Sequence, residues 1–410
     1  MREALALLRR RNFALLFAGR CISFLGNAMA PVAIAFAVLD LTDSATALGV
    51  VLAARMVPNI VFLLVGGVIA DRLPRSAVLV GSGLLGGVTQ GAVAVLLLAG
   101  VAEIWHLVVL EAVNGLAFAV WYPADTAVVP QTVPEDRLQD ANTVIRFGSN
   151  AMMVAGAALA GAIVSLSNPG WAIAADAATF LIAAALAAGM TGIGAVASGA
   201  TGVLRDLRDG WSEFVRHPWL WTVVLQFSVM LLGFFGAFQV LGPVVAEREY
   251  AGASSWAAIL GGQSAGLLAG GFVALRLRPA RPLLVATLCV FASAPPLAAL
   301  ALGLPVPLIV VATFATGVGM ELFGVYWYTA LHEHITPQAL ARVSAYDALG
   351  SLAISPVGYI AAGPLSDAIG VDATLWIGAL LVVVPTALVM LVPEVRQLRS
   401  RGLARETVPA

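Results

Sequence analysis

The sequence contains no lysine, because all 22 of its basic residues are arginine. A phosphate-binding loop of the G-x-x-x-x-G-K-[ST] type needs a lysine that reaches the β- and γ-phosphates of a nucleotide. A loop of this type is therefore excluded. Work done by this chain is not driven by a nucleotide-hydrolysing domain of its own.

Cysteine and charge are also scarce. The two cysteines, Cys21 and Cys289, both fall within apolar runs, which excludes a disulfide framework and a cysteine-based metal knuckle. Only 11% of the residues are charged, whereas roughly 25% is usual for a soluble domain. The chain is 60% hydrophobic and its mean hydropathy is +0.94, so the composition indicates a membrane protein.

Long apolar runs recur along the whole chain. About 20 apolar residues in a helix cross the ~30 Å of hydrocarbon in a bilayer. The sequence therefore predicts an all-α polytopic membrane protein with twelve transmembrane helices. The runs lie near 12–38, 45–70, 76–99, 104–128, 141–166, 170–190, 218–245, 254–275, 283–302, 306–330, 343–366 and 372–392.

The distribution of arginine predicts the orientation. With an even number of spans and the N-terminus inside, eighteen arginines fall in inner segments, three fall within spans, and only Arg248 lies outside. Inner loops of membrane proteins carry the excess of basic residues, so both termini are expected in the cytoplasm and the protein in the inner membrane. Arg2 and Arg9–Arg11 precede a long first run without a small-residue cleavage site. This run is therefore interpreted as a retained span and not as a signal peptide.

The two halves of the chain resemble each other at a fixed offset. The stretch GGVIADRLPR begins at Gly66, and GGFVALRLRPAR begins at Gly270, 204 residues later. Pro134 and Pro337 follow spans 4 and 10 at an offset of 203. These matches predict two six-helix pseudo-repeat bundles. We expect a first bundle over 1–190, a cytoplasmic connector over 191–217, a second bundle over 218–394 and a cytoplasmic tail over 395–410.

The loop between the second and third spans carries the sharpest motif, Gly67-Val-Ile-Ala-Asp71-Arg72-Leu-Pro-Arg75. It resembles the G-x-L-A-D-R-x-G-R-[RK] loop of the major facilitator superfamily. The resemblance implies the major facilitator fold and a gating role for Gly67, Asp71, Arg72 and Arg75, in which charges at an inner loop hold the halves closed and then release them. The alternative is a loop that merely carries inward-facing positive charge, which would not explain Asp71.

Further stretches are similar to the twelve-helix drug, macrolide and siderophore exporters of that superfamily. They are LTDSATALG, VPNIVFLLVGGVIADR, VPEDRLQDAN, ADAATFLIAAALA and LRDLRDGWSEFVRHPWL. Two family patterns are altered. Glu111 stands where helix 4 of many members has an arginine, and the segment from Gly156 to Gly161 lacks the proline of an exporter element. The proton handling usually assigned to that arginine is therefore not carried over.

Ionisable residues inside the spans are the main candidates for proton coupling or substrate binding. Each costs about 2.5–3.5 kcal/mol at the bilayer centre on insertion scales. The candidates are Glu321, Glu111, Arg20 and Arg55. Glu321 lies deepest, roughly 22 Å from the outer face at helical rise, and ranks first as a proton carrier. The family architecture implies that helices 1, 4, 7 and 10 line a central cavity. The alternative for each residue is a buried ion pair that holds helices together.

Three other charged residues near inner helix ends, Asp125, Arg146 and Asp347, are expected to make structural pairs, and Asp125 could accept from Arg72 or Arg75. Large aromatic side chains suit a bulky, partly apolar cargo, with a lipid-facing or interfacial role as the alternative. The cavity candidates are Trp121, Phe234, Phe238 and Trp327.

Other classes of function find no support in the sequence. His332 and His334 diverge by about 200° on a helix, so a metal site is not expected there. We expect no enzyme, no cofactor and no nucleic-acid partner, and a monomer in the lipid bilayer that binds a small-molecule substrate. The predicted function is a secondary active transporter, a proton-coupled exporter of hydrophobic or amphiphilic small molecules that works by alternating access. The alternative is an uptake symporter or facilitator for a polar metabolite.

Overall fold

The computed structural model of the protein describes residues 7–134, 137–193 and 211–400. Side chains are described for these residues except 63–72, 337, 338, 341, 342 and 345. Twelve helices within the described residues are long and apolar enough to cross a membrane, which confirms the predicted all-α fold class. The spans are generally a few residues longer than the apolar runs, because polar residues at the ends continue the helices.

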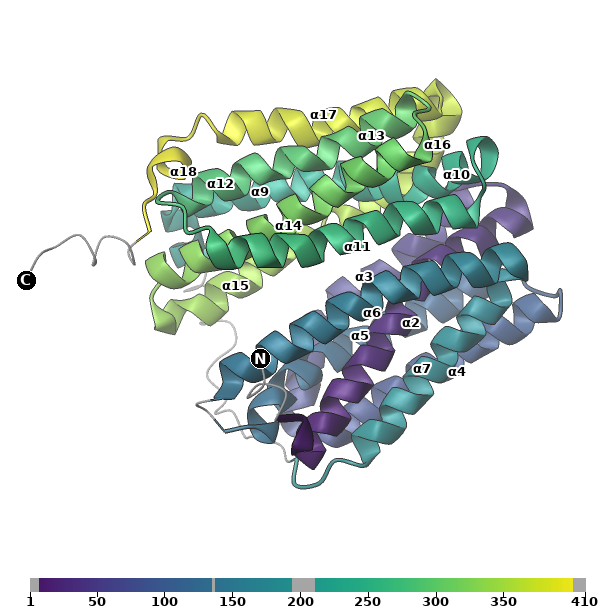
Figure 1. The fold of residues 1–410 in the computed structure, drawn as a ribbon, viewed down its shortest axis with the longest axis horizontal. Coiled ribbons are helices and arrows are strands. Elements are labelled where there is room, and N and C mark those ends of the chain that lie inside the picture. Colours follow the sequence, from purple (N-terminus) through teal and green to yellow (C-terminus); the bar gives the residue numbers. More distant parts are fainter. Residues whose placement is uncertain (1–6, 135–136, 194–210, 401–410) are drawn as a thin grey trace, which may run out of the picture. The chain divides into compact units, whose positions relative to one another are not determined.

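The helices of the first bundle pack closely (Figure 1). Helix α3 packs on α5, α2 packs on both α6 and α7, and α4 packs on both α5 and α7. Their bounds are η1 (Leu7–Arg9), α2 (Arg11–Thr42), α3 (Ala45–Arg72), α4 (Arg75–Leu98), α5 (Ile104–Thr132), α6 (Leu138–Leu166) and α7 (Pro169–Ala188).

Several spans of the later half consist of consecutive helical pieces. The span Pro218–Glu249 contains a π-helical turn, η3, between two α-helices, and the span Pro282–Ala301 contains a short 3-10 turn, η4. Their bounds are α9 (Pro218–Phe234), η3 (Phe235–Leu241), α10 (Gly242–Glu249), α11 (Ala253–Arg276), α12 (Pro282–Val290), η4 (Phe291–Ser293), α13 (Ala294–Ala301), α14 (Val306–His334), α15 (Pro337–Leu352), α16 (Ser355–Ile369), α17 (Val371–Val389) and α18 (Pro393–Gln397).

The chain divides into two compact units. The first comprises Met1–Ser198 together with Pro243–Gly261, and the second comprises Gly199–Gly242 and Gly262–Ala410. The segment Pro243–Gly261 joins the first unit because α11 lies directly against α6 there. A methyl group added at Gly161 would overlap the side chain of Ala257. Arg248 also lies 3.6 Å from Asp43, as an exposed ion pair of low energetic value.

Small residues allow close helix packing within each unit. In the first unit, a Cβ atom at Gly115 of α5 would overlap the backbone carbonyl oxygen of Arg55 in α3. In the second unit, a Cβ atom at Gly266 of α11 would overlap the carbonyl oxygen of Phe314 in α14. Lipid offers little hydrophobic drive for helix association, so such close backbone approach supplies much of the packing energy.

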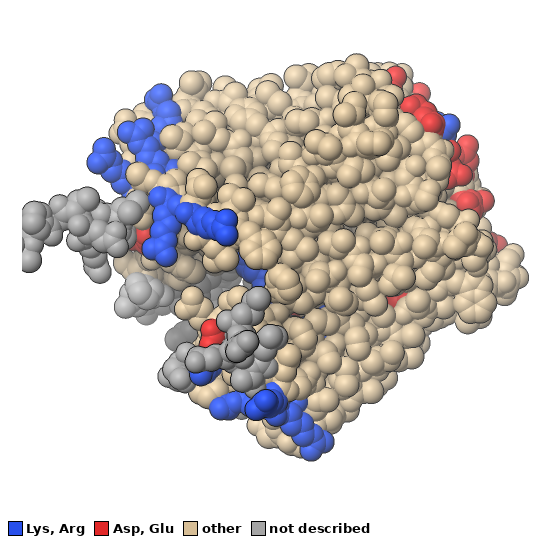
Figure 2. Space-filling view, viewed as in Figure 1, with Lys and Arg blue, Asp and Glu red and all other residues tan. Residues whose placement is uncertain are grey.

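Large apolar side chains cover the outside of the helices. Leu166 is 87% exposed, and Val88 and Val95 are about two-thirds exposed. Figure 2 shows that the charged side chains on the face in view gather at the helix ends and leave the long sides of the helices almost uncharged. This pattern suits a surface that contacts lipid tails, and the protein is a multi-pass membrane protein.

Candidate functional site

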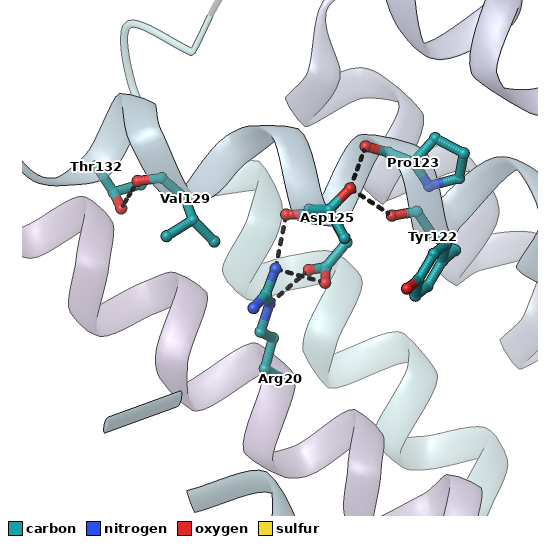
Figure 3. A network of polar contacts seen from close by, with 7 residues as sticks. Arg20, Tyr122, Pro123, Asp125, Val129 and Thr132 are labelled. Atoms are coloured by element: carbon teal, nitrogen blue, oxygen red, sulfur yellow. Dashed lines mark hydrogen bonds and ion pairs between the residues drawn. The ribbon is translucent and has the colours of Figure 1, made fainter. Parts of the chain in front are cut away.

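Arg20 and Asp125 form a buried ion pair between α2 and α5 (Figure 3). The Arg20 Nη2 atom lies 2.6 Å from Asp125 Oδ2, and Nε donates to Oδ1 at 2.9 Å. Nη2 also donates to the backbone carbonyl of Asp125 at 2.7 Å. The side chains are only 10% and 8% exposed, so two desolvated charges satisfy each other.

The described partner of Asp125 is therefore Arg20, which the sequence did not suggest. Arg75 donates from Nη1 to the backbone carbonyl of Ala127 at 2.7 Å, two residues along α5 from Asp125. Arg20 reaches Asp125 because α2 crosses α5 at this level. The side chains of Gly67, Asp71 and Arg72 lie outside the described residues.

A second pair, with a buried carboxylate and a partly exposed arginine, joins α3 to α5. Arg55 Nη1 lies 3.5 Å from Glu111 Oε2, and the Glu111 side chain is 2% exposed. Glu111 also accepts from Gln90 Nε2 of α4 at 3.0 Å, and Arg55 donates to Asn27 Oδ1 of α2 at 3.3 Å. Glu111 and Gly115 share one face of α5, so the close α3–α5 contact at Gly115 brings Arg55 within reach of Glu111.

Asp176 of α7 completes this group, and sequence reasoning missed it. Its side chain is fully buried, and the charged residues that act on it electrostatically are Arg55 and Glu111. The sequence did contain a signal for it. Asp176 is a carboxylate inside an apolar run, and the same feature identified Glu111 and Glu321 as candidates. It was considered only as part of the family-like stretch ADAATFLIAAALA. We call Asp176, Arg55 and Glu111 the acidic cluster.

Local packing positions the Asp176 carboxyl group. Gly26 of α2 leaves the space for it, because a Cβ atom at Gly26 would overlap Asp176 Oδ1 and Thr179 Oγ1. The Thr179 hydroxyl donates to the Asp176 backbone carbonyl at 2.7 Å and lies 3.4 Å from Oδ1. Asp176 Oδ2 is buried and accepts no hydrogen bond from any described residue.

A cavity of about 40 Å³ lies inside the first unit. This volume holds a few water molecules, since one water needs roughly 10–15 Å³ by the same kind of measure, and it is too small for a bulky cargo. Its walls come from α2, α4, α5 and α7, with Arg20 and Asp125 in one part of the wall and Asn27 and Asn114 in another. The polar residues that line it are Arg20, Ser23, Asn27, Ser82, Asn114 and Asp125, and its aromatic residues are Phe118, Trp121 and Phe180.

Three further candidates, Glu321, Asp347 and Trp327, belong to the second unit. Glu321 of α14 is half-buried and lies against α11, where its Cβ would be 2.9 Å from a Cβ added at Gly270. Asp347 accepts from Trp327 Nε1 at 3.0 Å, so it pairs with an indole and not with a described arginine. Trp327 is buried and packs on Trp219 with ring centroids 5.8 Å apart.

The aromatic candidates differ in their surroundings. Phe234 and Phe238 are buried and stack on each other at 4.8 Å, at and within the π-helical turn η3. A π-helical turn frequently marks a functional site. Trp121 is the one of the four that lines the cavity in the first unit. Arg146 also interacts with another group of the protein.

Among the described residues, no group of three histidine, cysteine, aspartate or glutamate side chains is placed to hold a metal ion. The chemistry within reach of the acidic cluster is therefore that of charge pairing and proton binding. Carboxylates and guanidinium groups at this depth in a membrane protein commonly belong to ion or substrate pathways.

Comparison with known proteins agrees with this architecture. The chain is 22% identical to macrolide efflux protein A of Streptococcus pyogenes over 396 residues, which cover 94% of this chain and 97% of the relative. It superimposes on the crystal structure of a mutant of the nucleoside transporter NupG with a TM-score of 0.72 at 14% identity, covering 92% of this chain and 99% of that chain. A mutant of the peptide transporter POT in complex with sulfate gives a TM-score of 0.74 at 13% identity, covering 95% of this chain and 96% of that chain.

The low identities to the solved structures show a shared fold alone. The model of the Major Facilitator Superfamily matches residues 16–346, which is most of the chain and includes all six spans of the first unit. With twelve spans, two compact units and this match, the chain belongs to the Major Facilitator Superfamily and is a secondary transporter, not an enzyme.

Proposed function

We propose that this transporter is a proton-coupled exporter of hydrophobic or amphiphilic small molecules, of the drug, macrolide or siderophore type. The observation that carries the proposal is the likeness to macrolide efflux protein A, which extends over almost the full length of both chains. The solved nucleoside and peptide transporters share only the fold and give no reason to assign their substrates to this chain.

The buried charges of the first unit support proton coupling. Glu111 and Asp176 are almost completely buried within spans, where the free energy of a carboxylate depends strongly on whether it carries a proton. A secondary transporter that expels cargo against its gradient needs such a group to couple transport to the proton gradient. We propose the proton gradient, and no cofactor, as the energy source.

We further propose that transport proceeds by alternating access of two six-helix bundles, 1–190 and 218–394, joined by the connector 191–217. Both termini lie in the cytoplasm, in accordance with the arginine distribution. The loop with Gly67, Asp71, Arg72 and Arg75 gates the cytoplasmic side. Arg75 supports this role, because it already ties the start of α4 to the end of α5 through the Ala127 carbonyl.

The test uses bacteria that lack their own efflux pumps and express the full chain. We expect a labelled macrolide to accumulate severalfold less in these cells than in cells without the protein, and a protonophore to abolish the difference. The matched control is Asp71→Asn, which should reach the membrane in normal amounts and export poorly because the gate loses its carboxylate. Equal macrolide accumulation together with increased uptake of a labelled nucleoside or peptide would replace the proposal with the uptake alternative.

A further inference from the structure

We propose that Asp176 is the proton-carrying residue of this transporter, that Arg55 and Glu111 set its proton affinity, and that the cavity in the first unit conducts the proton to and from it. This inference rests on the proposed proton coupling and names the site that performs it. It places proton binding inside one helix bundle, on a residue to which the sequence analysis assigned no role.

The charges of the acidic cluster do not balance unless one proton is bound. The cluster holds two buried carboxylates and one guanidinium group. Arg55 makes its ion pair with Glu111 at 3.5 Å, which leaves Asp176 without a cation of its own. An uncompensated charge in such a place costs several kcal/mol. A proton on Asp176 makes the cluster neutral.

The hydrogen bonds of the region also indicate that Asp176 carries a proton. Asp176 Oδ2 and Gln90 Oε1 are both buried, and neither accepts a hydrogen bond from a described residue. A buried acceptor without a donor destabilises the folded protein. Protonation changes Asp176 from a pure acceptor into a group that also donates, so it removes one orphaned acceptor and supplies a donor. A carboxyl group with a purely structural role would instead be satisfied by fixed neighbours, as Asp125 is by Arg20.

The cavity gives the proton a route. Asn27 and Asn114 line it, and each is bonded to the region of the acidic cluster: Asn27 accepts from Arg55, and Asn114 donates to Thr89, the neighbour of Gln90. The same cavity is lined by Arg20 and Asp125. Water molecules bound to the polar side chains of this cavity can form a hydrogen-bonded chain from the two asparagines to the Arg20–Asp125 pair.

The depth of the residues fits this route. Arg55 lies about 15 Å along α3 from its start, and Glu111 and Asp176 lie about 10 Å along α5 and α7 from theirs, at 1.5 Å per residue. These three starts are at the end of the bundle opposite to the arginine-rich end. Asp125, in contrast, lies near the arginine-rich end of α5. The proton therefore enters near the outer end and leaves toward the cytoplasm.

The proton step balances without any further reagent. In the loaded state the proton is bonded to the Asp176 carboxyl group, and Glu111 is paired with Arg55. On release, the O–H bond at Asp176 breaks and a new O–H bond forms on a water molecule, which leaves Asp176 as a carboxylate. A second proton from the outer side restores the acid.

Few charged groups other than Arg55 and Glu111 can influence Asp176. Helix α7 packs against α2, α4 and α6. The described charged side chains of these helices are Arg11, Arg20 and Asp40 on α2, Arg75 on α4, and Asp140 and Arg146 on α6. Among the described charged residues, Arg55 and Glu111, from α3 and α5, are those whose charges act on Asp176. The pH response of the site is therefore a property of the acidic cluster.

The test follows the proton itself and needs no cargo. The infrared spectrum of the purified full-length protein is recorded in lipid as the pH is varied, and the C=O band of protonated carboxylic acids is measured. We expect one component of this band to disappear as the pH rises in the wild type and to be missing from Asp176→Asn at every pH, while the components of the other carboxyl groups remain. The matched control is Asp372→Asn, an exposed carboxylate at the start of α17, which should keep that component. A spectrum of Asp176→Asn that keeps every component of the wild-type band overturns the proposal.

A second variant keeps the test decisive if Asp176→Asn does not fold. Glu111→Gln removes a negative charge next to Asp176 and leaves Arg55 free to pair with it. The carboxylate form of Asp176 then becomes more favourable, so its component of the band should disappear at a pH lower by roughly 1–3 units. An unchanged midpoint, or loss of that component in Glu111→Gln, shows that Asp176 is not the carrier.

The outcomes also separate this inference from the proposed function. If the wild type expels the macrolide and Asp176→Asn keeps every component of the band, the exporter stands and the inference fails. If the wild type expels nothing and the band still depends on Asp176, the proton site stands and the cargo assignment fails.

Discussion

At the scale of single residues, the buried Arg20–Asp125 pair has a measurable consequence for stability. Both side chains are at most 10% exposed, and Asp125→Ala would leave the Arg20 guanidinium buried without its counter-charge. Breaking such a pair costs about 3–5 kcal/mol. We expect a correspondingly large drop in the unfolding midpoint of the purified protein in detergent.

The matched control for this prediction is Asp140→Ala. Asp140 pairs with Arg137 at 2.9 Å, but both side chains are more than a third exposed. An exposed pair contributes about 0–1 kcal/mol, so this variant should unfold almost as the wild type does. The double variant Arg20→Ala with Asp125→Ala should recover part of the loss, because no single charge remains buried. Equal destabilisation by the two single variants would contradict the role of burial.

The two deepest carboxylates rank differently in the sequence and in the structure. Distance from the outer face ranks Glu321 first, whereas burial ranks Asp176 first, since Glu321 is only half-buried beside Gly270. We therefore expect Glu321→Gln to retain uphill, pH-driven export and Asp176→Asn to lose it while downhill exchange survives. Transport into inverted membrane vesicles with an imposed pH gradient measures both. Loss of uphill export in Glu321→Gln alone would return the carrier role to Glu321.

At the scale of helices, the contact between α3 and α5 depends on Gly115. A methyl group there would overlap the Arg55 carbonyl oxygen, which belongs to the backbone and cannot rotate away. Gly115→Ala should therefore separate the two helices, lower the unfolding midpoint and weaken the Arg55–Glu111 pair. The control is Gly81→Ala in α4, where nothing lies within 4 Å of the added Cβ. Thermal unfolding of both variants in detergent measures the difference, and equal midpoints would contradict the close packing.

At the scale of the whole molecule, the orientation in the membrane is open to a labelling test. After replacement of Cys21 and Cys289 by serine, a single cysteine is introduced by Ala251→Cys or by Ala200→Cys. Residue 251 lies between α10 and α11 at the end that carries few arginines, and residue 200 lies in the predicted cytoplasmic connector. An impermeant thiol reagent added to intact cells should label the first and not the second. The opposite pattern would reverse the orientation inferred from arginine.

The sequence alone determined the class of this protein and its number of spans, and the pseudo-repeat stays a prediction. The cause is the apolar interior of the bilayer. A helix that crosses it needs about 20 consecutive apolar residues, and such a run can be recognised directly in the sequence. The Gly67–Arg75 loop added the family, because its residues are close together in the chain.

Partners that lie far apart in the chain were decided only by the tertiary structure. Arg20 was expected on a cavity helix, and Asp125 was assigned to Arg72 or Arg75, yet the two are each other's partners across 105 residues. The acidic cluster likewise draws on α3, α5 and α7. Close contacts at glycine determine which faces of the helices meet, as at Gly115 against Arg55 and at Gly26 against Asp176. The buried charges on those helix faces then pair with each other. Hydropathy reports the depth of a residue, whereas helix packing decides its neighbours.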